Sequence, residues 1–600
     1  MHSLLRFPSQ VGRAGQVARA ILSTLMLALG ATISCSQQPA QPPPQNAGSG
    51  DAAFTELARQ ILDDHYKRHP SLATDLGLHQ YDAELEDPSE GAVHAESQAL
   101  QQFRAKLAAI DGATLTADKQ LDREQLQRAL DAGVLALDRI RQWAKDPDSY
   151  SGAITNSAYV IMKRNYAPAS DRLTSLIARE KKMPAALLEA RKNLGTPPRV
   201  YTEIAIEQID GNIRFFKNDL PKAFADVTDT AHGALLAAFR QSNNDVIAAL
   251  ADYKAYLQKT LLPKSTGSFA YGDEVYRLAL ADYEMIEMSP ADLLTIAEAD
   301  RQKNEEAFQA AAKQIDPDRN ADQVLAAMQA DHPPADTLLQ ATQDMLDSIR
   351  QFIVDHQIVT IPPSDPAKVK ETPPFMRSTT SASMDTPGPF ERAKLDAYYN
   401  MTLPDPRWSA AERADFMRQW YYPAIANTSV HEVYPGHYIQ FLYAKDFPSD
   451  VRKVYGAASN AEGWAHYAEQ MMIDEGFHAG EPKYRLAQLQ DALLRDVRFI
   501  VGIKMHVQGM NVEEATKLFE TTAHQPHPVA VSEAKRGASD ALYGYYTMGK
   551  LMILKLREDY KAKKGSDYSL RGFHDAFIRI GPLPLPLIRR ALLGEVGRLF

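Results

Sequence analysis

The chain has 600 residues, of which 45% are hydrophobic and 24% are charged. This composition is that of a folded globular protein and excludes a disordered or fibrous chain. The length exceeds what a single core usually fills, so we expect two domains or one large helical body with lobes. The formal net charge of -10 offers no basic surface to a phosphate backbone, and we therefore expect no nucleic-acid partner.

Residues 1–35 are typical of a signal peptide of the lipoprotein kind. Arg13 and Arg19 precede an apolar run over residues 20–33, which is short for a membrane span. Cys35, the only cysteine, follows this run and resembles the acylated cysteine of bacterial lipoproteins, although Thr32 stands where such signals usually carry leucine. We expect an exported protein anchored in the cell envelope by lipid at Cys35 and facing the periplasm; a plain secretory signal is the alternative. Residues 36–51, rich in Gln, Pro, Ser and Gly, predict a flexible tether.

Residues 52–289 show apolar side chains at helical spacing and predict an N-terminal helical scaffold. The clearest amphipathic segments are Leu121 to Lys145, Met183 to Leu194 and Ala231 to Leu261. Long alternating patterns typical of strands are absent from this sequence. The fold class that we expect is therefore mainly α.

Residues 290–600 predict a second helical region, which begins after a helix start at Ser289 and Pro290. Residues 397–401 form the best candidate for a short strand, and Ser409 with Glu412 has the form of a capping box. Further helices are expected over residues 462–475, 484–506, 512–521 and 541–559. This half is expected to be the metal-binding catalytic region, with a small β element before the metal-binding helix.

The segment from His431 to His437 contains the residue types of a zinc site. Two imidazoles can bind the metal, and Glu432 can activate a water molecule as a general base. The histidines are six residues apart, however, so a regular helix would place them about 120° around the axis and about 9 Å along it. Pro435 lacks a backbone donor and Gly436 is conformationally free, so we predict a break that returns His437 to the side of His431.

Glu462 is the best candidate for the third metal ligand, because a second helix beginning near it can pack beside the first. His466 and Glu469 share its helix face and are candidates for partners that orient the ligands. Standing alone, Glu462 and His466 would more simply be a solvated pair. Glu475 and His478 show the spacing of a second metal site, but Gly476 is expected to end the helix and disfavours it.

The motif from His431 to Gln440, together with the segment from Glu462 to Ala465, resembles the bacterial domain-of-unknown-function 885 family. This resemblance covers nearly the whole mature chain. Proteins of this family in turn resemble helical zinc peptidases of the carboxypeptidase Taq and thimet oligopeptidase type. The resemblance implies a helical body around a deep cleft, peptidase activity, and Tyr546 as a donor to the oxyanion; Tyr546 as a packed aromatic is the alternative.

The same resemblance leaves further residues and functions open. Tyr543 and Tyr545 are neighbours that can be confused with Tyr546, and Arg498 and His506 are weaker candidates for substrate contacts. We expect an exported metallohydrolase, with zinc as its cofactor and a peptide or related amide as its substrate. The alternatives are a lipid-anchored binding protein with a non-catalytic metal site, and a non-peptide amidase or esterase. The oligomeric state and the choice between exo- and endopeptidase action do not follow from the sequence.

Overall fold

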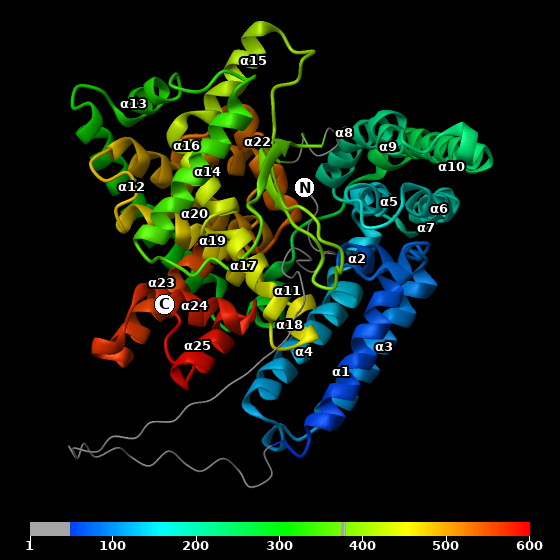
Figure 1. Cartoon of the computed structure of the whole chain (residues 1–600), viewed down its shortest axis with the longest axis horizontal. Helices are drawn as coiled ribbons and strands as arrows, with labels where there is room; N and C mark the ends of the chain where they lie inside the picture. The colour runs from blue at the N-terminus through cyan, green and yellow to red at the C-terminus, as the bar shows by residue number, and fades with distance from the viewer. Residues whose placement is uncertain (1–47, 374–376, 378–379) are drawn as a thin grey trace.

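The computed structural model describes residues 48–373, 377 and 380–600. Helices dominate it and one small sheet accompanies them, so the expected mainly α fold is confirmed (Figure 1). The predicted signal peptide, Cys35 and most of the predicted tether lie outside the described residues. No helix in the described ranges is long and apolar enough to cross a membrane.

The N-terminal half consists of helices that mostly appear blue to green-blue toward the right of Figure 1, whereas its last helix is green and lies nearer the middle. Their bounds are α1 (Asp51–Arg68), α2 (Pro70–Asp75), α3 (Glu90–Ala108), α4 (Ala117–Leu135), α5 (Pro147–Met162), α6 (Ala169–Glu180), α7 (Met183–Asn193), α8 (Arg199–Arg214), α9 (Leu220–Ala223), α10 (Asp229–Tyr256) and α11 (Gly272–Glu284). Two predicted helices, over residues 183–194 and 231–261, are confirmed as α7 and as α10 with the wider turn that follows it.

The predicted helix from Leu121 to Lys145 is wrong at its end. The α4 helix stops at Leu135, a wider turn continues to Ile140, and Arg141 then adopts a left-handed backbone conformation with φ 54°. The Trp143 indole holds this turn by donating a hydrogen bond to the carbonyl of Leu137, at 3.0 Å. No glycine or proline marks the break, so no local pattern in the sequence indicates it.

The C-terminal half supplies the helices that carry the predicted motif. Their bounds are α12 (Pro290–Ile315), α13 (Ala321–Met328), α14 (Leu338–Asp355), α15 (Ala410–Met417), α16 (Tyr422–Glu432), α17 (His437–Tyr443), α18 (Asp450–Val454), α19 (Ala458–Asp474), α20 (Pro482–Val507), α21 (Val512–Thr522), α22 (His527–Ser539), α23 (Tyr545–Lys564), α24 (Leu570–Ile580) and α25 (Leu585–Leu593). Ser289 caps α12, and the capping box of Ser409 and Glu412 starts α15, as predicted. The helix expected from residue 541 begins only at Tyr545.

A three-stranded sheet precedes the motif, and the predicted β element is confirmed. It consists of β1 (Lys368–Glu371), β2 (Ala382–Asp385) and β3 (Tyr398–Met401) in the order β1-β3-β2. β1 runs parallel and β2 antiparallel to the central β3. The strand predicted over residues 397–401 is this central strand, and the edge strand β2 lies against α16.

The core packs α16, α19 and α23 closely around the motif. Gly463 of α19 faces Gly549 of α23 so tightly that a Cβ atom on Gly463 would lie 2.4 Å from the Cα atom of Gly549. Trp464, fully buried in this core, donates a hydrogen bond to the carbonyl of Pro435, at 2.9 Å. The two glycines therefore set the spacing between the helix that carries Glu462 and the helix that carries Tyr546. The division of the chain at residue 289 stays a prediction.

Candidate metal centre

The break predicted at Pro435 and Gly436 is confirmed. The α16 helix ends at Glu432, and α17 begins at His437 after a turn that contains a cis peptide bond before Pro435. The Gly436 N–H donates to the carbonyl of Val430, at 3.0 Å. A Cβ atom on residue 436 would lie 1.8 Å from the carbonyl oxygen of His431, so the turn requires glycine because of this close approach.

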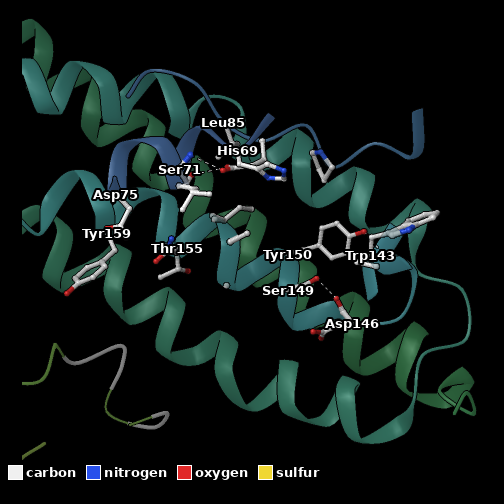
Figure 2. Close-up of a pocket in the computed structure, with 18 of the residues that line it drawn as sticks. His69, Ser71, Asp75, Leu85, Trp143, Asp146, Ser149, Tyr150, Thr155 and Tyr159 are labelled. Carbon is white, nitrogen blue, oxygen red and sulfur yellow. Dashed lines mark hydrogen bonds between the residues drawn. The ribbon is translucent and has the colours of Figure 1, made fainter. Parts of the chain in front are cut away.

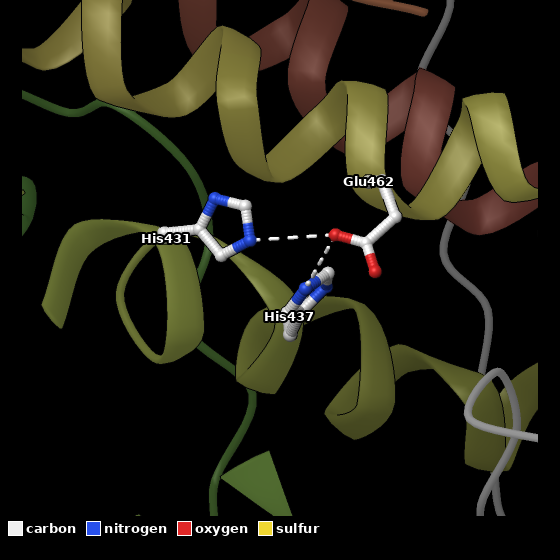
Figure 3. A group of neighbouring side chains, drawn as sticks. All are labelled: His431, His437 and Glu462. Carbon is white, nitrogen blue, oxygen red and sulfur yellow. Dashed lines mark ion pairs between the residues drawn. The ribbon is translucent and has the colours of Figure 1, made fainter. Parts of the chain in front are cut away.

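The turn brings both histidines to the same carboxylate (Figure 3). The Nε2 atoms of His431 and His437 lie 3.4 and 3.3 Å from Oε2 of Glu462, which projects from α19. Three zinc ligands at bond lengths of about 2.0–2.1 Å on tetrahedral corners are about 3.3–3.4 Å apart. The distances between the histidine nitrogens and Glu462 thus match the edges of a zinc tetrahedron.

The atom that closes this group is itself unsatisfied. Oε2 of Glu462 is buried and makes no hydrogen bond to any other described residue. Two imidazole nitrogens and one carboxylate oxygen form a donor set that suits zinc and leaves a fourth position open. Within the described ranges, this is the group of three or more candidate ligands that can hold a metal ion.

Glu469, seven residues or about two helical turns beyond Glu462 in α19, orients His431 from the other side. Its Oε1 atom lies 2.6 Å from Nδ1 of His431, which leaves Nε2 directed at the ligand group. Arg495, His466 and Asn427 also contact this fully buried carboxylate, at 3.2–3.3 Å. A carboxylate behind a ligating histidine is the usual support of zinc sites. Of the two predicted orienting residues, Glu469 contacts the ligand directly, and His466 contacts Glu469.

The charged groups around His431 and Glu469 shift the pKa of both side chains. Burial alone would raise the pKa of the Glu469 carboxyl, but Arg495 and the nearby histidines hold it well below its ordinary value. Burial alone would lower the pKa of His431, but Glu462 and Glu469 raise it to about 10. Two carboxylates on either side of one imidazole thus make this position favourable for a positive charge.

Glu432, the predicted general base, is fixed by the sheet. Its Oε2 atom accepts a hydrogen bond from the backbone N–H of Met384 in β2, at 3.0 Å. Its Oε1 atom has no hydrogen-bond partner in the part of the chain that the structure describes. The residue directly follows His431 in α16, so the strand β2 holds one of its oxygens while the other stays available.

The three neighbouring tyrosines, which the sequence could not distinguish, differ in their hydrogen-bond partners. Tyr543 donates to Glu533, and Tyr545 donates to Oδ2 of Asp540 at 2.8 Å. Tyr546 only accepts a hydrogen bond, from Nη2 of Arg536 at 3.1 Å, and its proton has no acceptor within the described ranges. The rings of Tyr546 and His431 lie 6.3 Å apart. Tyr546 is therefore the tyrosine beside the ligand group that retains a free donor.

Other predicted residues are held elsewhere. Arg498 forms two hydrogen bonds of 2.7 Å with Glu533, so this carboxylate already occupies its guanidinium. The His506 ring is buried, and its Nε2 atom lies 2.9 Å from the carbonyl oxygen of Gly537. The disfavoured second metal site does not form among the described residues: the His478 ring pairs with Glu481 at 2.9 Å.

A cavity of about 450 Å³ lies beside β2, between helices of the N-terminal half and this strand. Among the lining residues labelled in Figure 2, Tyr150, Thr155 and Tyr159 lie along α5, and Ser71 and Asp75 belong to α2. Met384 lines it together with its neighbours in β2, and the N–H of Met384 also donates to Glu432. The candidate ligands His431, His437 and Glu462 do not line this cavity, so the deep cleft that the family resemblance implies stays a prediction.

Sequence reasoning missed several residues around the ligand group. Met384 contributes only its backbone N–H, which no side-chain pattern reveals. Arg536 and Glu533 lie on α22, whose buried residues are all small, namely Ala530, Ala534, Gly537 and Ala538. The four-residue spacing of these alanines is a weak helical signal that could have identified α22.

Comparisons with known proteins concern the family and the fold of the chain. A family described as a bacterial protein of unknown function, DUF885, matches residues 70–592. Similar solved structures include "a putative lipoprotein of unknown function from Shewanella oneidensis", with a TM-score of 0.75 and 27% identity over 90% of this chain and 99% of that one. Another is "the putative lipoprotein from Colwellia psychrerythraea", with a TM-score of 0.74 and 18% identity over 91% of this chain and 99% of that one, a likeness of fold alone. No curated protein matches the chain. Because the family match covers most of its length, the chain belongs to the DUF885 family.

Proposed function

We propose that this protein is a zinc-dependent hydrolase of peptides or related amides. The observation that carries the proposal is the meeting of His431 Nε2, His437 Nε2 and Glu462 Oε2 at distances of 3.3–3.4 Å. A buried carboxylate oxygen without a hydrogen bond supports a cation in this position. These three residues would hold the metal, and Glu469 would fix the orientation of His431.

The residues around the ligands support a hydrolytic role over a storage role. When bound, zinc polarises a carbonyl group and lowers the pKa of water. Glu432 accepts the proton of the attacking water on its free oxygen and delivers it to the leaving amine. A purely structural or storage site has no need of a carboxylate held beside its ligands in this way.

Tyr546 supplies the donor for the oxyanion. Its hydroxyl already accepts from Arg536, which orients its own proton away from that cation and toward the remaining space. A neutral hydroxyl placed in advance stabilises the negative charge that develops on the carbonyl oxygen during attack. Loss of this hydroxyl in Tyr546→Phe should lower kcat with little change in KM, because the contact forms mainly in the transition state.

We also propose that the protein is exported and anchored in the envelope through lipid on Cys35. The apolar run before Cys35 and the polar segment after it support this location. Two proteins of similar fold are described as lipoproteins, which supports it further. Mass spectrometry of the mature N-terminus tests the anchor: a diacylated Cys35 is expected, and a free or absent Cys35 contradicts it.

The test of the hydrolase uses Glu432→Gln, a change of one charge at constant size. Zinc content and cleavage of a mixed peptide library are measured for the natural protein and for this variant. We expect retained zinc and lost cleavage in Glu432→Gln, and lost zinc in Glu462→Gln. Glu475→Gln, an exposed change at the end of α19, is the matched control and should alter neither quantity.

Three results would contradict this proposal. Unchanged cleavage in Glu432→Gln would exclude the mechanism. A natural protein that holds zinc but cleaves neither peptides nor esters would be a binding protein. Cleavage of acyl esters with no cleavage of peptides would identify the site as an esterase.

A further inference from the structure

Arg536, on α22, contacts three tyrosine side chains beside the ligand group. Its Nη2 atom donates to the hydroxyls of Tyr545 and Tyr546, at 3.2 and 3.1 Å. Its guanidinium carbon lies 4.7 Å from the ring centre of Tyr543. Three aromatic side chains thus hold the guanidinium in one orientation, which reduces the entropy lost when it binds a ligand.

The charge of Arg536 lacks a hydrogen-bonded carboxylate. Its ion-pair partner among the described residues is Asp540, whose Oδ2 atom is 3.9 Å from Nη2 and already accepts from Tyr545. Its Nε and Nη1 atoms make no hydrogen bond within the described chain, and 30% of the side chain is exposed. Three N–H donors of a fixed cation therefore remain available.

Two neighbouring arginines, unlike Arg536, donate hydrogen bonds to carboxylates of the protein. Arg498 binds Glu533 through two hydrogen bonds of 2.7 Å. Arg495 pairs with Asp491 at 3.0 Å and with Glu469 at 3.3 Å. These two guanidinium groups are committed to carboxylates of the protein, whereas the hydrogen bonds of Arg536 go to neutral hydroxyls.

Arg536 is also close to the reacting group. It shares the hydroxyl of Tyr546, the ring of which is 6.3 Å from the ring of the ligand His431. An anionic group held by Arg536 would thus lie within one or two residues of a peptide bond positioned at the metal ligands, because consecutive Cα atoms are about 3.8 Å apart. A guanidinium fork with free Nε and Nη1 atoms suits the two oxygens of a carboxylate.

We propose that Arg536 binds a carboxylate of the substrate, so that the site selects peptides with an acid group close to the scissile bond. The proposal rests on the hydrolytic function above and adds a substrate class to it. The carboxylate has two sources in peptides, the free C-terminus and an acidic side chain. Their chemistry at the guanidinium is the same.

The test measures binding, so that it does not depend on turnover. Zinc-loaded Glu432→Gln protein is incubated with two mixtures of acetylated tetrapeptides, one ending in a free acid and one in an amide. Retained peptides are identified by ultrafiltration and mass spectrometry. A third mixture, with Glu or Gln inside amidated peptides, separates an acidic side chain from the C-terminus.

We expect the acid forms to be retained more strongly than the amides, by roughly tenfold to a hundredfold, and Arg536→Gln to remove most of this preference. Arg536→Lys keeps the charge without the fork and should keep a smaller preference. Lys535→Gln is the matched control. It removes the cation next to Arg536 on α22, which pairs with Glu207 of α8, and it should leave the preference intact. Thermal unfolding of each variant verifies its fold.

The outcomes separate this inference from the proposed function. A preference for acids that is equal in Arg536→Gln and its parent overturns the inference, as does equal or undetectable retention of acids and amides by the parent. A preference that vanishes without zinc but persists in Arg536→Gln assigns the carboxylate to the metal and also overturns it. Lost preference in Arg536→Gln supports it, even if the natural protein cleaves no peptide and the proposed hydrolysis fails.

Discussion

Replacement of Glu469 by Gln removes one charge behind the metal ligands while keeping the size of the side chain. In the natural protein Oε1 of Glu469 lies 2.6 Å from Nδ1 of His431. The neutral amide retains one acceptor oxygen but withdraws the negative charge that raises the basicity of His431. Arg495 keeps a carboxylate partner, Asp491 at 3.0 Å, so the guanidinium does not become unpaired.

We expect Glu469→Gln to weaken zinc binding by about 10-fold to 100-fold, which corresponds to about 1.4–2.7 kcal/mol. Competition with a zinc chelator of known affinity measures this change. Glu533→Gln is the matched control, because it also removes a buried carboxylate that pairs with an arginine but contacts no candidate ligand in the described chain. Both variants should lose some thermal stability, and only Glu469→Gln should lose zinc affinity.

Two results would refute this reasoning. The first is a Glu469→Gln protein that binds zinc as tightly as the natural protein. The second is an equal loss of zinc affinity in both variants, which would show that the loss reflects general destabilisation and not the support of His431.

Two further predictions concern packing and pH. Gly463→Ala should destabilise the protein by about 1–3 kcal/mol, because its methyl group would lie 2.4 Å from the Cα atom of Gly549. Gly91→Ala is the control, because a methyl group there meets no atom within 4 Å. Equal unfolding midpoints of the two variants would contradict the prediction. Burial raises the pKa of Glu180 from 4.5 to about 8 although Ser242 donates to it. The folded protein then keeps a proton that the unfolded chain releases, so stability falls as pH rises from about 4.5 to 8. Glu180→Gln should remove this loss of stability, on the order of 3 kcal/mol at pH 7. Urea titrations at pH 5 and pH 8 measure the free energy of unfolding of the natural protein and of Glu180→Gln. If the difference between the two proteins is the same at both pH values, the prediction is wrong.

The parts of the site that sequence predicted correctly depend on local chemistry. Pro435 and Gly436 cannot continue a regular helix with its usual hydrogen bonds, so a break between His431 and His437 followed from these residues alone. The helix that carries Glu462 was expected from residue 462 onward, although it begins at Ala458, and it packs beside α16. The helical fold class was equally accessible, because apolar spacing of three and four residues recurs along most of the chain.

The parts that sequence missed depend on contacts between distant segments. The hydrogen bond from Met384 to Glu432 spans 48 positions and involves a backbone group. Tyr546 could be distinguished from its neighbours only when Asp540 and Arg536 were placed against them. The early end of α4 depends on the indole of Trp143, which folds back onto the preceding turn. Propensity and spacing contain no information on such tertiary partners.

The most direct test of the metal centre combines zinc content with X-ray absorption at the zinc edge. We predict one zinc per chain, with two imidazole nitrogens and one carboxylate oxygen at about 2.0–2.2 Å and a fourth light ligand. The His437→Ala variant should lose one imidazole from this spectrum and most of its zinc. A natural protein that binds no zinc, or a spectrum that is unchanged in His437→Ala, would contradict the assignment of His431, His437 and Glu462 as the metal ligands.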